Sequence, residues 1–90
     1  MGRQRVTDEQ QRQGRALGVR LSAMRGKVTQ AELADRAGMS LDTLRKIELG
    51  KVAGPSFFFI GQIVDAAGGR LDALWAEMRL GAAARERDDA

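Results

Sequence analysis

The sequence predicts an all-α domain of five helices, and three observations support this fold class. Apolar residues recur at the three- and four-residue spacing of an amphipathic helix in five separate segments. Glycines and the single proline fall between those segments, where such residues end helices. No stretch shows a convincing alternation of apolar and polar residues, which would indicate a half-buried strand. A chain of 90 residues makes one small domain, so we expect these helices to share one core.

The first helix is expected to begin at Thr7 or Asp8 and to run to about Arg25. Two glycines, Gly14 and Gly18, weaken this helix, since each costs about 1 kcal/mol relative to alanine. The apolar residues at helical spacing are Leu17, Leu21 and Met24.

Two short helices with complete start and stop signals follow. Thr29 caps the first of them, and Glu32 three residues later predicts a capping box with bonds in both directions. Gly38 ends this helix, Ser40 caps the next, and Gly50 ends that one. The linker is too short for independent motion, so the pair is predicted to form a helix-turn-helix, which presents one helix to the DNA major groove.

The residues of these two helices divide into an inward and an outward set. Ala34 is expected where the helices approach most closely, because a larger side chain would force them apart. The other inward positions are Leu33, Ala37, Met39, Leu44 and Ile47. The outward positions of the second helix of the pair are Leu41, Asp42, Thr43, Arg45, Lys46 and Leu49.

After the break at Gly54-Pro55, Ser56 can cap a fourth helix that runs through Ala67. This segment has too many apolar positions for one narrow stripe, so we expect it to be largely buried, or partly buried against another subunit. A turn at residues 68–69 precedes a fifth helix, for which Arg70 is a poor N-cap. One apolar face of that helix holds Leu71, Leu74, Trp75 and Met78.

Three parts of the chain are expected from this pattern. Residues 1–7 form a flexible basic N-terminal arm, residues 8–80 the helix-turn-helix domain, and residues 81–90 a tail that lacks apolar anchors and frays. Arg3 and Arg5 of the arm could reach a DNA groove or phosphates, as arms do in other DNA-binding families. A disordered basic tail is the competing interpretation.

Composition argues against several classes of function. The chain has no cysteine and no histidine, which removes disulfides, thiolate metal sites and the usual general base. No P-loop or glycine-rich dinucleotide motif is visible, so we expect no enzyme, no catalytic residues, no cofactor and no metal. The longest apolar run, residues 57–60, is too short to span a membrane, and no signal-peptide core follows the N-terminus. A cytoplasmic, nucleoid-associated protein is expected.

Charge is unevenly distributed along the chain. Residues 1–54 carry a net charge of +5 and residues 55–90 a net charge of −2, which together give the net +3 of the whole sequence. A basic N-terminal half fits a surface that faces a polyanion, although ordinary solvated charge would give the same count.

The segment QAELADRAGMSLDTLRKIELGK, residues 30–51, resembles the helix-turn-helix of the phage Cro/repressor type. Bacterial regulators of the xenobiotic-response-element (XRE) type belong to the same family. The resemblance extends through VDAAGGRLDAL at residues 64–74 and covers about residues 15–78. It implies a compact, five-helix, lambda-repressor-like DNA-binding domain. The implied function is that of a transcriptional regulator, a repressor, that reads double-stranded DNA with the helix Leu41–Leu49.

The resemblance also implies roles for individual residues. Gln30 would contact phosphate through its side chain and the helix N-terminus, while Glu48 matches a structural position. Leu41, Asp42 and Lys46 match the family's base-reading positions. Thr43, Arg45 and Lys51 match positions that commonly touch the DNA backbone or the edge of the groove. The whole set expected at DNA is Gln30, Ser40, Leu41, Asp42, Thr43, Arg45, Lys46 and Lys51.

The reading positions depart from those of the well-known phage members, which often have amide side chains there. Leu41 could contact a thymine methyl group, Asp42 could accept from cytosine N4, and Lys46 could donate to guanine O6 and N7. Each has a plainer interpretation. Leu41 could be an incidental exposed leucine, Asp42 a carboxylate favoured by the helix dipole, and Lys46, like Arg45, a solvated charge.

The surplus of apolar residues after Pro55 predicts a homodimer through the fourth and fifth helices. Of the three consecutive phenylalanines, Phe58 is the expected exposed one, with Trp75 and Leu80 as the other interface residues. Packing of Phe58 against the first helix or the N-terminal segment is the alternative. A second hypothesis for function is an antitoxin-like or adaptor protein whose C-terminal end, residues 85–90, binds a protein partner.

Overall fold

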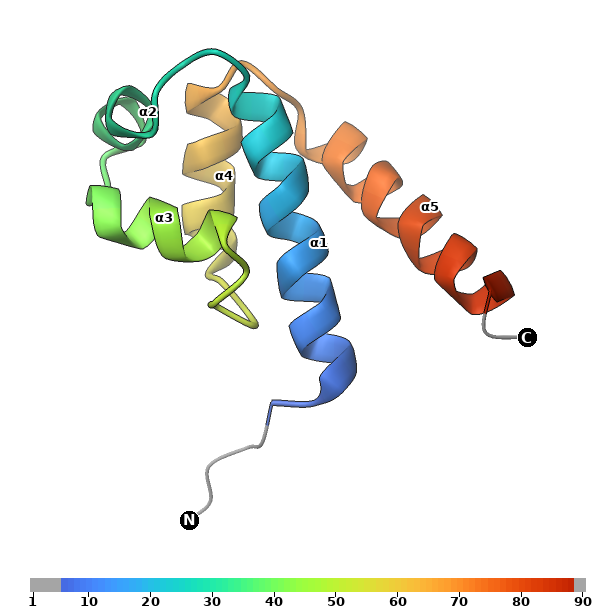
Figure 1. Cartoon of the computed structure of the whole chain (residues 1–90). Coiled ribbons are helices and arrows are strands. Elements are labelled where there is room, and N and C mark those ends of the chain that lie inside the picture. Colours follow the sequence, from blue (N-terminus) through green and yellow to red (C-terminus); the bar gives the residue numbers. More distant parts are fainter. Residues whose placement is uncertain (1–5, 89–90) are drawn as a thin grey trace.

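The computed structural model describes residues 6–88, and the side chains of these through residue 84. Within that part of the chain there are five helices and no strand (Figure 1), which confirms the all-α fold class. Helix α1 spans Asp8–Arg25, α2 Gln30–Ala37, α3 Leu41–Glu48, α4 Phe57–Ala66 and α5 Leu71–Asp88. Arg3 and Arg5 of the expected arm, and the side chains of residues 85–90, lie outside the described residues.

Side-chain caps fix the start of each of the first three helices. Thr7 Oγ1 accepts from the Gln10 N–H at 3.0 Å, and Gln10 Oε1 accepts from the Thr7 N–H at 2.9 Å, a complete capping box at α1. Thr29 Oγ1 accepts from the Glu32 N–H at 3.1 Å. Within the described residues, the Glu32 side chain accepts no bond from the Thr29 N–H. The capping box predicted at α2 is therefore only half formed.

The helix-turn-helix linker is closed by backbone hydrogen bonds. Gly38 has a φ of 72°, which favours glycine, and the next N–H, that of Met39, donates to Ala34 O at 3.0 Å. Gly50 repeats this geometry after α3, with a φ of 73° and a bond of 2.9 Å from the Lys51 N–H to Lys46 O. Both stops predicted from the sequence are therefore confirmed.

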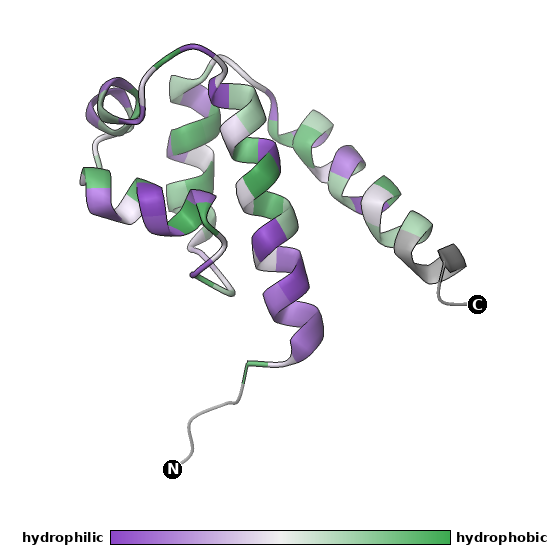
Figure 2. Cartoon of the chain, viewed as in Figure 1, coloured by the Kyte–Doolittle hydropathy of each residue, from purple (hydrophilic) through white to green (hydrophobic). Residues whose placement is uncertain are grey.

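One apolar core holds the helices together. The helix-turn-helix residues predicted to face inward are buried, except Met39, which is half-buried against the core. Figure 2 shows that α4 is apolar along most of its length, whereas the N-terminal half of α1 is hydrophilic. The core is made of Leu21, Leu33, Ala34, Leu44, Ile47, Ile60, Ile63, Val64 and Leu74.

The start of α4 differs from the expectation that it would be largely buried with Phe58 alone exposed. Phe57, Phe58 and Phe59 are 68%, 74% and 40% exposed. Consecutive helical residues point about 100° apart, so three in a row cannot share one face. The helix instead turns the i, i+3, i+4 set of Ile60, Ile63 and Val64 into the core.

Helix α5 is the least covered element. Leu74 is 4% exposed, but Trp75 is 65% and Leu80 68% exposed, so the predicted apolar face is only partly buried. At the poorly capped start, Arg70 bonds to Asp72, and these bonds lower the pKa of the Asp72 carboxyl, keeping it charged near the helix N-terminus.

Helix α5 continues past Leu80 to Asp88, into the segment for which the sequence predicts a frayed tail. The domain bounds expected from the sequence stay a prediction. The segment after Gly81 is rich in alanine, arginine and glutamate, which are strong helix formers, so local propensity extends the helix without apolar anchors. Of the helices described, none is at once long and apolar enough to cross a membrane.

The two glycines expected only to weaken α1 lie where α1 crosses the end of α3. A Cβ added at Gly18 would contact Glu48 O and lie 2.7 Å from Ile47 O, and one at Gly14 would lie 3.1 Å from Val52 O. Both glycines are buried. They therefore allow α1 to approach the backbone of α3 and of the following loop.

Replacing Gly18 with alanine should destabilise the protein although alanine favours helix. The added methyl group meets backbone atoms that cannot rotate away, so we expect a loss of roughly 1–3 kcal/mol in the free energy of unfolding, measured with urea. Gly61 of α4 is the matched control, since its added Cβ meets nothing within 4 Å. Gly61→Ala should gain about 0.5–1 kcal/mol. An equal gain for both variants would contradict the close approach.

Candidate nucleic-acid interface

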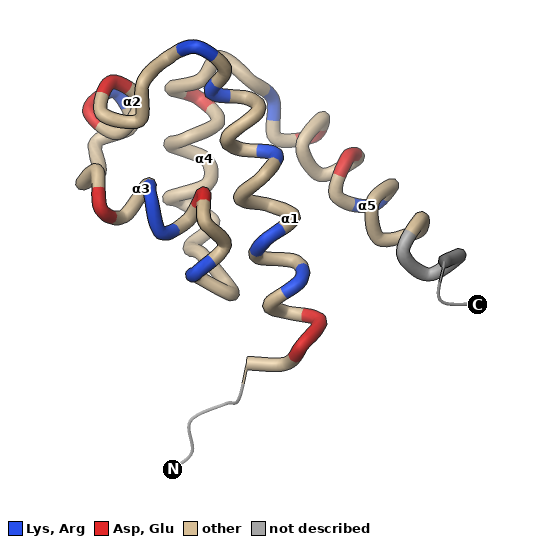
Figure 3. The backbone as a smooth tube through the Cα atoms, viewed as in Figure 1, with Lys and Arg blue, Asp and Glu red and all other residues tan. Residues whose placement is uncertain are grey.

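Helix α3 presents one polar side to solvent and one apolar side to the core. Leu44 and Ile47 are 0% and 2% exposed, while Asp42, Arg45 and Lys46 lie on the surface. Figure 3 shows these charged positions on the outer part of the chain, together with the basic residue of the loop after α3. The structure therefore places Asp42, Arg45 and Lys46, which the sequence predicts at DNA, on one exposed face of α3.

Asp42 and Lys46 form an ion pair across one helical turn of this face. The Lys46 Nζ–Asp42 Oδ2 distance is 3.0 Å, and the two side chains are 57% and 74% exposed. A surface pair of this kind contributes about 0–1 kcal/mol, so it can open at little cost. It holds a donor and an acceptor side by side at the centre of the face.

Ser40 and Thr43 use their hydroxyl groups to start α3. Ser40 Oγ accepts from the Thr43 N–H at 3.1 Å and donates to Thr43 Oγ1 at 2.8 Å. Ser40 has thereby used its single O–H donor, whereas the Thr43 hydroxyl can still donate. Both were expected at DNA. Thr43 is the better placed of the two to give a hydrogen bond to an outside acceptor.

A half-buried polar cluster, Arg25, Gln30 and Glu48, joins the first three helices. Glu48 Oε2 accepts from Arg25 Nε at 2.9 Å, and Glu48 Oε1 accepts from Arg25 Nη2 at 3.0 Å and Gln30 Nε2 at 2.9 Å. The Glu48 side chain is 4% exposed and that of Arg25 18%. Hydrogen bonding to Glu48 raises the pKa of the Arg25 guanidinium, which therefore stays charged. Arg25 also donates to Val28 O at 2.8 Å.

This cluster bears on two residues of the sequence analysis. Glu48 is a structural residue, as expected from its position. The Gln30 side chain, expected at phosphate, here donates to Glu48, and only its second amide hydrogen remains for an outside acceptor. Arg25 was not identified from the sequence. A carboxylate between inward-facing residues of α3 signals that a cation must lie nearby, but it does not say on which helix.

The remaining predicted DNA residues lie at the edges of the face. Leu41, at the start of α3, is half-buried, and Arg45 and Lys51 are exposed. The Lys51 backbone is held at the C-terminal end of α3 by its bond to Lys46 O. Within residues 6–84, no group of three or more acidic residues could hold a metal ion.

The residues predicted for a dimer interface are exposed but do not form one cluster. Trp75 lines an apolar groove between α1, α4 and α5, and Phe57, not Phe58, lines it with Trp75. Phe58 meets Phe57 edge to face, with ring centroids 5.7 Å apart. Phe57 is therefore a further surface residue, although the sequence analysis expects only Phe58 of the three phenylalanines to be exposed.

Comparison with known proteins agrees with this geometry. The family model of the helix-turn-helix domain matches residues 16–78, which include all of α2, α3 and α4, most of α1 and the first part of α5. A search of the curated proteins found no match. A helix-turn-helix domain of the DNA-binding type is typically non-enzymatic.

Removing the charge of Glu48 should cost more stability than removing that of an exposed partner. Glu48→Gln leaves the half-buried Arg25 without a counter-charge, so we expect a loss of roughly 2–4 kcal/mol in the free energy of unfolding. Glu77→Gln breaks the more exposed Arg20–Glu77 pair and should cost less than about 1 kcal/mol. Similar losses for the two variants would show that the cluster does not fix the three helices.

Proposed function

Since the chain belongs to the helix-turn-helix domain family, we propose that it is a sequence-specific transcriptional regulator that binds duplex DNA with α3. The observation that carries this proposal is the exposed polar face of a short helix whose other side packs in the core and whose C-terminal residue, Glu48, is held by the cluster. Such a helix can enter the major groove without rearranging the domain. Repression is the proposed outcome, because a bound domain can block a promoter by occupancy alone.

The proposed reading chemistry follows from the side chains on this face. Lys46 would donate to guanine O6 and N7, and Asp42 would accept from cytosine N4. The ion pair places the Lys46 ammonium and the Asp42 carboxylate side by side. Because one would bind guanine and the other cytosine, the pair suits neighbouring G·C base pairs better than A·T base pairs. Leu41 would contact a thymine methyl group at the start of the helix.

The contacts to the DNA backbone would come from α3, from the loop after it and from the start of α2. Thr43, Arg45 and Lys51 would bind phosphates beside the groove, and Ser40 would lie next to them. At the start of α2, the free backbone N–H groups and the second amide hydrogen of Gln30 would bind a phosphate on the other side of the groove. These contacts would set the register of α3 without selecting a sequence.

We further propose that two copies bind together through α4 and α5. Six large apolar side chains of these helices are between 39% and 74% exposed, and a second copy would cover part of this apolar surface. A two-fold dimer would read half-sites about 34 Å apart. A protein partner on the same surface is the adaptor alternative. The interface residues are proposed to be Phe57, Phe58, Leu71, Trp75 and Leu80.

The experiment that tests the DNA proposal starts with selection from a pool of random duplexes. The protein should enrich one sequence, and a pool that stays random would remove the claim of specific binding. On the enriched duplex Lys46→Ala should weaken binding about 10- to 100-fold, as expected for a lost base contact, and far less on an unrelated duplex. Arg70→Gln, which removes a charge from the turn before α5, is the control and should change binding to neither duplex. Equal losses on both duplexes would make Lys46 a phosphate contact.

Sedimentation equilibrium at micromolar concentration tests the dimer. The unmodified chain should have twice the mass of one chain, and Phe58→Glu should reduce it to a single chain, because a charge is placed in an apolar interface. Val19→Glu changes an equally exposed apolar residue of α1 and should leave the dimer intact. A dimer that survives Phe58→Glu excludes Phe58 from the interface, and a monomeric unmodified chain overturns the dimer.

A further inference from the structure

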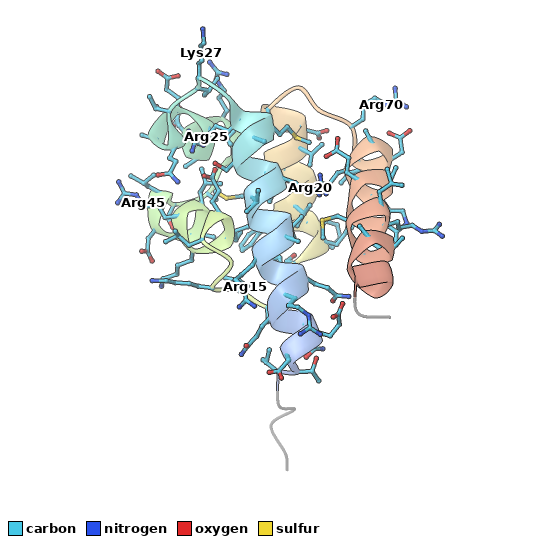
Figure 4. All side chains as sticks on the ribbon, turned by 45° about the vertical axis from the view of Figure 1, so that its right-hand side comes forward. Arg15, Arg20, Arg25, Lys27, Arg45 and Arg70 are labelled. Atoms are coloured by element: carbon cyan, nitrogen blue, oxygen red, sulfur yellow. The ribbon has the colours of Figure 1, made fainter. Side chains whose placement is uncertain are left out.

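A basic residue of α1, Arg15, lies beside the end of α3 although it is outside the helix-turn-helix. A Cβ added at Gly50 would lie 2.6 Å from Arg15 Cα and 2.7 Å from Arg15 Cγ. Gly50 directly precedes Lys51, so Arg15 and Lys51 flank the same backbone turn. Figure 4 labels Arg15 on the lower part of α1.

The position of Arg15 is rigid. Gly14, its neighbour, would meet Val52 O at 3.1 Å if it carried a Cβ, and Gly18 one turn later contacts the last carbonyls of α3. The backbone of α1 is therefore pressed against α3 and its loop on both sides of Arg15. The Cα of Arg15 is thus held at a fixed place beside the loop after α3.

Within the described residues, Arg15, Arg45 and Lys51 have no acidic partner. This distinguishes them from the other basic residues nearby, since Arg25 is bound to Glu48 and Lys46 to Asp42. The acids close to this end of α3 are thus already neutralised. Two uncompensated basic residues, Arg15 and Lys51, remain beside Gly50, and such a pair attracts a polyanion.

We propose that Arg15 and Lys51 form a phosphate-binding site at the C-terminal end of α3, for one phosphodiester of the DNA backbone. The planar guanidinium of Arg15 can bind two phosphate oxygens at once, and the Lys51 ammonium adds a point charge from the facing loop. The site rests on the proposed DNA-binding function and deepens it, because it adds α1 to the footprint. A contact from a third helix would fix the angle at which α3 lies in the groove.

The test measures binding of fluorescent duplexes by anisotropy between 50 and 200 mM KCl, with the selected duplex and one of unrelated sequence. Arg15→Gln should weaken binding about 3- to 10-fold on both duplexes. With Arg15→Gln the slope of log K against log salt concentration should become shallower, but by less than the roughly 0.9 of one whole phosphate, because Lys51 still pairs with that phosphate. Lys51→Gln should give the same partial change, and the double variant Arg15→Gln/Lys51→Gln should make the slope shallower by about 0.9. Arg15→Lys should keep the slope with a smaller loss. Arg70→Gln, of equal charge change in the turn before α5, should alter neither.

The outcomes separate the site from the function on which it rests. If the unmodified chain binds neither duplex, the DNA proposal fails and the site fails with it. If the chain prefers the selected duplex but Arg15→Gln keeps the slope of the Arg70→Gln control, only the phosphate site is overturned. A loss confined to the selected duplex would assign Arg15 to base reading and would likewise overturn the site. Thermal unfolding of each variant verifies that it is folded.

Discussion

The arrangement of the three N-terminal helices depends on the buried carboxylate of Glu48. Its two oxygens receive bonds from the end of α1, through Arg25, and from the first residue of α2, through Gln30. A buried charge without partners costs several kcal/mol, so these bonds cannot be lost one at a time without penalty. Apolar packing is not directional. This polar cluster supplies the directional constraint that holds the α3 face in one orientation.

A second constraint acts along the same crossing. Gly14 and Gly18 remove the side chains that would separate α1 from α3, and the cluster then closes the far end of the contact. Close approach and the polar bonds of α1 therefore depend on each other, because a wider gap between α1 and α3 would lengthen both bonds from Arg25 to Glu48. The same approach brings Arg15 to the loop after α3, so a packing requirement also shapes the charge of the outer face.

The parts of the fold that could be predicted from the sequence are those with local causes. Caps at Thr29 and Ser40 and stops at Gly38 and Gly50 act within one turn, and each was predicted correctly. Features set by distant segments could not be predicted. Helix propensity describes Gly18 only as a weakness, because the α3 carbonyls that need its bare backbone come from a different part of the chain.

The candidate site follows the same division. The outward face of α3 follows from helical periodicity, so its charged residues were placed correctly before their surroundings were known. The Gln30 bond to Glu48 and the nearness of Arg15 to Lys51 depend on how helices cross. Exposure of Phe57 likewise depends on how α4 packs against its neighbours, and no local pattern carries that information.

The central claim is that the outer face of α3 contacts DNA. It is tested most directly by backbone amide chemical shifts of the labelled full chain, recorded as the selected duplex is added. The account predicts the largest changes at residues 41–46, at the start of α2 and at residues 50–52. Changes confined to the start of α4 and to α5, with α3 unaffected, would contradict it.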